Sequence, residues 1–158
     1  MRLDPGLRIG TYATFSALIV TGAAWLAADQ LKDTESGEFW QAVGADMLML
    51  HGGCAMIALV LLGALIPVHL QRSWRAGRNR MSGSVMVAVN ASLIVTAFAL
   101  YYAGSDALRM FAADIHIAVG LGLPAVIITH IALGRRMRAL TVRPLLQPVT
   151  FSEDRGSP

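Results

Sequence analysis

The stretch Asp114–Arg136, DIHIAVGLGLPAVIITHIALGRR, places two of the chain's four histidines in one long apolar run. His116 and His130 are fourteen residues apart in this stretch. An α-helix turns by about 100° and rises about 1.5 Å per residue, so His130 returns to within about 40° of His116, roughly 21 Å further along the axis. The sequence therefore predicts a helix that carries one histidine near each end of the same face.

The other two histidines, His51 and His69, share a second apolar run and are eighteen residues apart. Eighteen residues make about five full helical turns, so these two rings also share one face, roughly 27 Å apart along the axis. Pro67 removes one backbone hydrogen bond and predicts a bend just before His69. Glycines follow the first histidine of each run, which favours either close helix packing or space for a flat macrocycle. These glycines are Gly52, Gly53, Gly120 and Gly122.

The composition is that of a small integral membrane protein. Hydrophobic residues make up 55% of the 158 residues, charged residues make up 15%, and the mean hydropathy is +0.56. Soluble domains have roughly 45–50% apolar and about 25% charged residues. We expect an all-α, four-helix, up-and-down bundle in one domain, residues 1–140, followed by a partly disordered cytoplasmic tail, 141–158. The four helices are predicted at about 7–28, 47–70, 85–103 and 113–134.

The first apolar run follows a positively charged start, which is also typical of a cleaved signal peptide. It is long enough to span a membrane, and we expect it to be retained as a packing helix. The polar loop Asp29–Asp46 is predicted to include a short surface helix starting at Ser36, with docking of a soluble electron partner as an alternative role. Asn90 is interpreted as an interhelical hydrogen-bonding residue, with a link to a cofactor or to a quinone as the alternative, and Cys54 as a small buried residue.

The basic residues predict the orientation in the membrane. Eleven of the 13 Lys and Arg residues lie in the amino terminus, the second connection and the carboxyl tail, and two lie in the first and third loops. Loops rich in Lys and Arg stay on the cytoplasmic side. We therefore expect both termini in the cytoplasm, and we read the net charge of +3 as topology rather than as nucleic-acid binding.

With alternating topology, the two histidine-bearing helices run in the same direction. His51 and His116 are then expected at one depth, near the outer surface, and His69 and His130 at another, near the inner surface. Histidine in a membrane helix is costly and usually functional. Neutral imidazole is a good axial ligand for haem iron, and a bundle core is a usual place for such a cofactor.

The arrangement therefore favours two non-covalent b-type haems, each between two histidines. Zinc is less favoured, because it would require further Cys, His or carboxylate ligands at the same depth. Two other classes of function stay open: a membrane anchor or assembly subunit with structural histidines, and a small proton-coupled transporter.

These residues resemble the four-helix, di-haem b-type cytochromes, which include respiratory cytochrome b, the haem subunits of hydrogenases and formate dehydrogenases, and small bacterial membrane cytochromes b. The spacing of His116 and His130 is similar to that family's pattern, and so are Gly120 and Gly122. The resemblance covers about Met47–Arg136. The separation of His51 from His69 departs from it by about one turn, or roughly 6 Å of rise.

The resemblance implies transmembrane electron transfer in the bacterial inner membrane, with a quinone or a redox protein as partner. The chain has no flavin or nicotinamide fingerprint, so we expect a carrier or a subunit of a larger complex rather than a self-contained oxidoreductase. Haem propionates are anionic and would pair with guanidinium groups near the inner histidines. The candidates for this role are Arg72, Arg75, Arg135 and Arg136.

Overall fold

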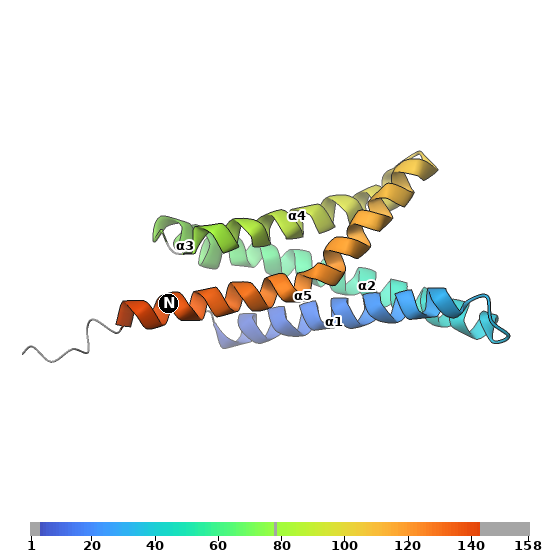
Figure 1. Ribbon diagram of the computed structural model, residues 1–158, viewed down its shortest axis with the longest axis horizontal. Helices are drawn as coiled ribbons and strands as arrows, with labels where there is room; N and C mark the ends of the chain where they lie inside the picture. The colour runs from blue at the N-terminus through green and yellow to red at the C-terminus, as the bar shows by residue number, and fades with distance from the viewer. Residues whose placement is uncertain (1–3, 78, 143–158) are drawn as a thin grey trace, which may run out of the picture.

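The computed structural model describes residues 4–77 and 79–142, with side chains as far as Met137, and this part of the chain is all-α, as the sequence predicts. Its elements are α1 (Pro5–Leu31), α2 (Gly37–Leu65), the π-helical segment η1 (Ile66–Leu70), α3 (Gln71–Arg75), α4 (Arg80–Tyr102) and α5 (Asp106–Val142), arranged as in Figure 1. All but the first two residues of the predicted tail, 141–158, lie outside the described residues.

Four helical stretches are long and apolar enough to cross a membrane, which makes the chain a multi-pass membrane protein. They are Pro5–Leu31, the continuous run Gly37–Arg75, Arg80–Tyr102 and Asp106–Met137. Their large apolar side chains face outward: Val60 is 74% exposed, Met56 71% and Ile128 67%. In a bilayer such a surface lies against lipid, which is as apolar as the side chains themselves.

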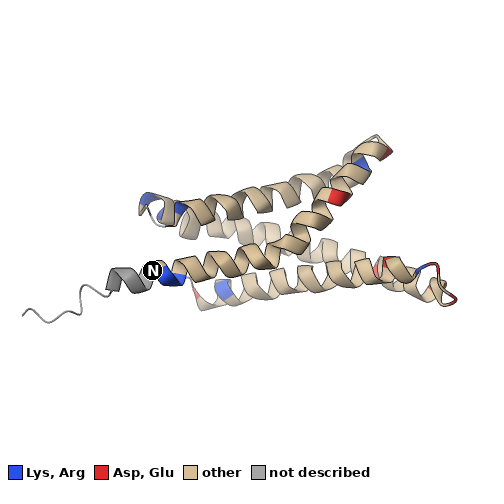
Figure 2. Cartoon of the chain, in the orientation of Figure 1, with Lys and Arg blue, Asp and Glu red and all other residues tan. Residues whose placement is uncertain are grey.

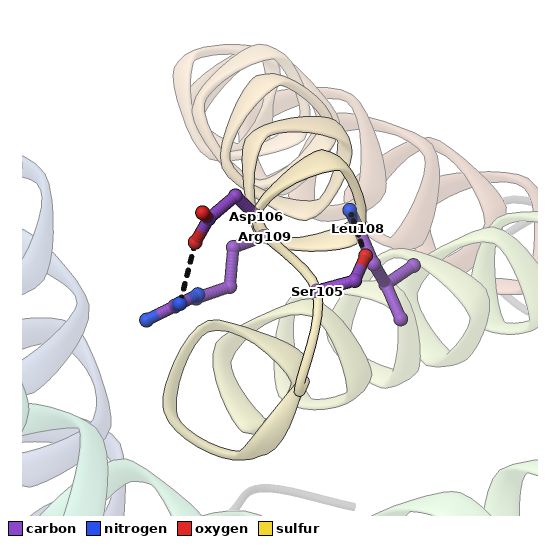
Figure 3. Close-up of polar contacts among 4 residues, drawn as sticks. All are labelled: Ser105, Asp106, Leu108 and Arg109. Atoms are coloured by element: carbon purple, nitrogen blue, oxygen red, sulfur yellow. Dashed lines mark hydrogen bonds and ion pairs between the residues drawn. The ribbon is translucent and has the colours of Figure 1, made fainter.

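Two predicted boundaries are wrong, because charged residues interrupt the apolar runs without ending the helices. The loop expected at 104–113 is helical from Asp106, where the Ser105 hydroxyl accepts the backbone N–H of Leu108 at 3.1 Å and caps the first turn (Figure 3). Arg109 and Asp106 form an ion pair of 2.6 Å on the same turn. The short surface helix expected after Ser36 is instead the beginning of α2.

The helices form two hairpins. α1 packs along α2, and α4 packs along α5, whereas contact between the hairpins is slight. Small residues let the first hairpin close: a Cβ at Gly44 would lie 3.7 Å from the Ala28 Cβ and 3.9 Å from a ring carbon of Trp25. Within the described residues the buried apolar side chains are few, namely Phe15, Ala28, Ala58, Ala112 and Leu123.

Prolines alter the course of both histidine-bearing helices. In the second span, Pro67 cannot donate a hydrogen bond to the Gly63 carbonyl, and the N–H of Ile66 reaches that carbonyl and the Leu62 carbonyl instead. The following turn is π-helical and closes with a bond from the N–H of Gln71 to the Ile66 carbonyl. In the fourth span α5 bends near its middle, and Pro124 lies inside the helix (Figure 1).

Charged residues gather at the two ends of the molecule, and the long middle stretches of the helices carry almost none (Figure 2). At the end where α3 joins α4, the described charged residues are mainly arginines. At the opposite end the loop between α1 and α2 is largely acidic. Lys32 at that end donates to Asp29 at 2.9 Å, and this hydrogen bond raises the pKa of Lys32 above its ordinary value.

Candidate functional site

The structure brings the four histidines together as two pairs, in the combination that helical periodicity and alternating topology together predict. His51 of α2 faces His116 of α5, with ring centroids 6.3 Å apart and ring planes at 77°. His69 of η1 faces His130 of α5, with centroids 6.2 Å apart and planes at 79°. Each pair joins one hairpin to the other, and all four residues are partly buried.

The separation of the rings is compatible with two imidazoles bound to one metal ion. A ring nitrogen lies about 1.1–1.2 Å from the ring centre, and a bond from imidazole nitrogen to a metal ion is about 2.0–2.1 Å. Two rings on opposite sides of one ion therefore have centres roughly 6.2–6.6 Å apart. Both observed distances, 6.3 Å and 6.2 Å, fall in this range. The match holds at both levels of the molecule.

The donor set decides which kind of metal centre fits. Among the described residues, no group of three His, Cys, Asp or Glu side chains comes together. Two imidazoles alone are too few for a structural or catalytic zinc ion, which takes three or four protein ligands. They suit iron in a porphyrin, which brings four equatorial nitrogens and needs only axial ligands from the protein. The residues present therefore fit haem.

Hydroxyl groups on the two helices without histidines hold three of the rings. Thr21 of α1 lies 3.0 Å from Nδ1 of His51, and Thr96 of α4 lies 2.9 Å from Nδ1 of His116. At the other level, Ser82 of α4 lies 2.9 Å from Nδ1 of His130. His69 has contacts of its own as well. The two helices without histidines therefore orient the histidine rings, a role that the sequence analysis did not predict for either.

Sequence reasoning missed these hydroxyls because serine and threonine in a membrane helix usually bond to their own helix. Thr21 does so too, donating to the Ala17 carbonyl at 2.7 Å. A further residue that was missed is Gly22, where a Cβ would lie 3.3 Å from Cε1 and 3.5 Å from Nδ1 of His51. The sequence does contain a pattern that indicates this contact. Thr21 and Gly22 are adjacent, and they place a hydroxyl beside a residue without a side chain in the helix that precedes His51.

The four glycines predicted to make room near the histidines differ in their surroundings. A Cβ at Gly53 or Gly122 would meet nothing within 4 Å. At Gly52 it would lie 3.9 Å from the Tyr101 hydroxyl, and at Gly120 it would lie 3.9 Å from Leu93. None of the four packs against a histidine ring, and that position is taken by Gly22 instead.

Polar and basic residues surround the second pair. His69 and His130 line a small pocket of about 70 Å³ together with Ser73 and Arg80. A wider, mostly apolar pocket of about 540 Å³ adjoins it and includes Trp74 and Arg75 in its wall. The other arginines predicted to lie near this pair, Arg72, Arg135 and Arg136, are exposed on α3 and α5.

Asn90 and Cys54 are the remaining polar residues that the sequence singles out within the apolar runs. The Asn90 side chain donates to the Met86 carbonyl of its own helix at 2.8 Å, so its expected interhelical bond is replaced by a local one. Cys54 is a free, partly buried thiol in α2.

Comparison of the chain with models of protein families, with curated proteins and with solved structures finds no match.

Proposed function

We propose that this protein carries electrons across a membrane through two b-type haems, each held between one histidine of the first hairpin and one histidine of the second. His51 and His116 are the proposed axial ligands of one haem, and His69 and His130 are those of the other. Haem bound at these positions supplies one-electron redox chemistry, while the chain sets its position and its potential.

The observation that carries the proposal is the ring separation of 6.3 Å in one pair and 6.2 Å in the other. A single such pair has a simple explanation in packing. Two pairs, each matching the span of a bis-imidazole metal centre and each joining the two hairpins, are better explained by two cofactors. Their positions at two levels of the helices are what electron transfer through a membrane requires.

The charge distribution supports an orientation for this conduit. The arginine-rich end is the proposed cytoplasmic face, and Arg80 of this end lines a pocket with His69 and His130. The end with the acidic loop is the proposed outer face (Figure 2). On this basis both termini are cytoplasmic. We propose the bacterial inner membrane as the location, following the resemblance to small bacterial cytochromes b.

A quinone or a second redox protein is the proposed partner, because the resemblance to di-haem b-type cytochromes implies one and the sequence has no flavin or nicotinamide fingerprint. The arginines on α3 and at the end of α5 are proposed to pair with haem propionates at the cytoplasmic face. The protein would then act as a carrier or as a subunit of a larger redox complex.

The test is the visible spectrum and haem content of the purified protein. We expect sharp α and Soret bands on reduction and about two haems per chain. His116→Ala and His130→Ala should each remove one haem and leave the other, because the two ligands belong to different pairs. The exposed Thr129→Val on the same helix should retain both haems.

A colourless preparation that is folded and pure would refute the proposal. Retention of both haems in His116→Ala and in His130→Ala would refute the ligand assignment. Circular dichroism of each variant distinguishes a lost cofactor from an unfolded chain.

A further inference from the structure

The hydroxyls of Thr21 and Thr96 are in matching environments on α1 and α4. Thr21 Oγ1 lies 2.7 Å from the Ala17 carbonyl oxygen and 3.0 Å from His51 Nδ1. Thr96 Oγ1 lies 2.7 Å from the Ser92 carbonyl oxygen and 2.9 Å from His116 Nδ1. Among the described residues, these two threonines are also the buried polar ones, with 9% and 8% of their surface exposed.

The short contacts to carbonyl oxygens determine where the hydroxyl protons lie. A carbonyl oxygen only accepts, and a separation of 2.7 Å between two oxygens is the ordinary length of an O–H···O bond. Each threonine therefore donates its single proton to its own helix. Toward the histidine ring, the threonine oxygen is then the acceptor.

This proton arrangement fixes the tautomer of both histidines. If the threonine oxygen accepts, Nδ1 of the ring must carry the hydrogen. In a neutral imidazole the other nitrogen, Nε2, then has a free lone pair and can bind a metal ion. His51 and His116 are held in the same state by the same device, one on each hairpin.

Resting on the proposed function, we infer that Thr21 and Thr96 are positioning residues that lower the reduction potential of the haem between His51 and His116. An acceptor for the Nδ1 hydrogen increases the basicity of the imidazole as a ligand. A more electron-rich ligand stabilises ferric iron more than ferrous iron. The hydroxyls thereby bias this haem toward its oxidised form and orient both rings for binding.

The variants Thr21→Val and Thr96→Val, singly and combined, test this inference. Valine keeps the branched shape of threonine and removes the hydroxyl acceptor, whereas Thr21→Ser and Thr96→Ser keep it. The backbone of Leu18 and Leu93, which also hydrogen-bonds to His51 and His116, is the same in all these variants. Thr129→Val is the matched control, because the Thr129 hydroxyl also donates to its own helix, at 2.8 Å, but the residue is exposed. Should a valine variant fail to fold, the corresponding alanine variant serves in its place.

The measurements are the haem content and an optical redox titration of the purified full-length protein in detergent. The titration step that disappears in the variant His116→Ala belongs to this haem. The step of the other haem serves as the internal reference. We expect each valine variant to raise the midpoint potential of this haem alone, and the double variant to raise it further. Its haem affinity should fall by about 10- to 100-fold. The serine variants and Thr129→Val should match the wild type.

The inference is overturned if folded valine variants hold two haems with both midpoints unchanged, or if the serine variants shift as far as the valine variants. These results leave the proposed function intact. A wild-type protein without haem would instead refute the proposed function itself, and this inference with it.

Discussion

Gly22 of α1 lies against the His51 ring, next to Thr21. We expect Gly22→Ala to displace this ring, because the added Cβ would lie 3.3 Å from Cε1, tighter than ordinary van der Waals contact. Alanine stabilises a helix by about 0.5–1 kcal/mol over glycine, but crowding a packed ring costs about 1–3 kcal/mol. The net result should be a loss on the order of 1 kcal/mol, with weakened binding at the His51–His116 pair. Thermal unfolding and haem content measure both effects.

Gly63→Ala on α2 is the control for this change. A Cβ at Gly63 meets nothing within 4 Å, so only the gain in helix propensity of about 0.5–1 kcal/mol is expected. If Gly22→Ala behaves like Gly63→Ala, the close approach of α1 to His51 has no role in the site.

At this scale the sequence predicts the histidine pairs better than the residues that contact them. The histidine pairs follow from two rules: residues fourteen or eighteen apart return to one face of a helix, and alternating topology places the two helices in the same direction. Thr21, Thr96 and Ser82 do not follow from it. Their roles depend on how α1 and α4 are rotated about their own axes, and weakly amphipathic membrane helices carry little sequence information on that rotation.

Among the elements, η1 takes up part of the four-residue difference between the two histidine spacings. Its π-helical turn closes with an i→i+5 bond and so uses about one residue more than an α-turn. The bend of α5 is a second departure from a straight helix. The sequence indicates a bend at Pro67. It does not indicate a wide turn, which depends on how the freed carbonyl of Gly63 finds another donor.

We expect Pro67→Ala to restore the missing donor and convert η1 to a regular α-helix. His69 would then rotate away from His130, so the second haem should be lost or should bind more weakly, while the haem at His51 and His116 is retained. Haem content and the redox titration report this difference. Val68→Ala, an exposed change in the same segment, is the control and should retain both haems. Two normal haems in Pro67→Ala would mean that the π-helical turn is dispensable.

The start of α5 is a second place where the sequence predicts an element incorrectly. Asp106 and Arg109 interrupt the apolar run, which predicts a loop. The same residues support a helix start, because an acidic residue in the first turn and an i,i+3 ion pair both stabilise it. Hydropathy marks where a helix enters the membrane, and the helix itself extends beyond that point.

The whole molecule consists of two hairpins with little direct contact, joined across their interface by the histidine pairs. On the proposed function, haem supplies much of the stability between the hairpins. A ligand at 100 times its dissociation constant stabilises the folded state by about 2.7 kcal/mol. We expect haem-free protein, or the double variant His116→Ala and His130→Ala, to unfold at a markedly lower temperature than the loaded wild type.

Circular dichroism in detergent follows this transition. Far-ultraviolet helical content before heating should be similar in both forms, since each helix satisfies its own backbone hydrogen bonds. Equal melting temperatures with and without haem would show that the hairpins hold together through contacts between their side chains alone.

The division of each pair between the hairpins has a consequence for biosynthesis. The first hairpin carries His51 and His69, and the second carries His116 and His130, so a growing chain with three helices in the membrane holds only half of each pair. Both pairs are completed by the same late event, the insertion of α5. On the proposed function, a translation product that lacks α5 could not hold haem between two axial ligands, so cofactor loading would follow the synthesis of α5.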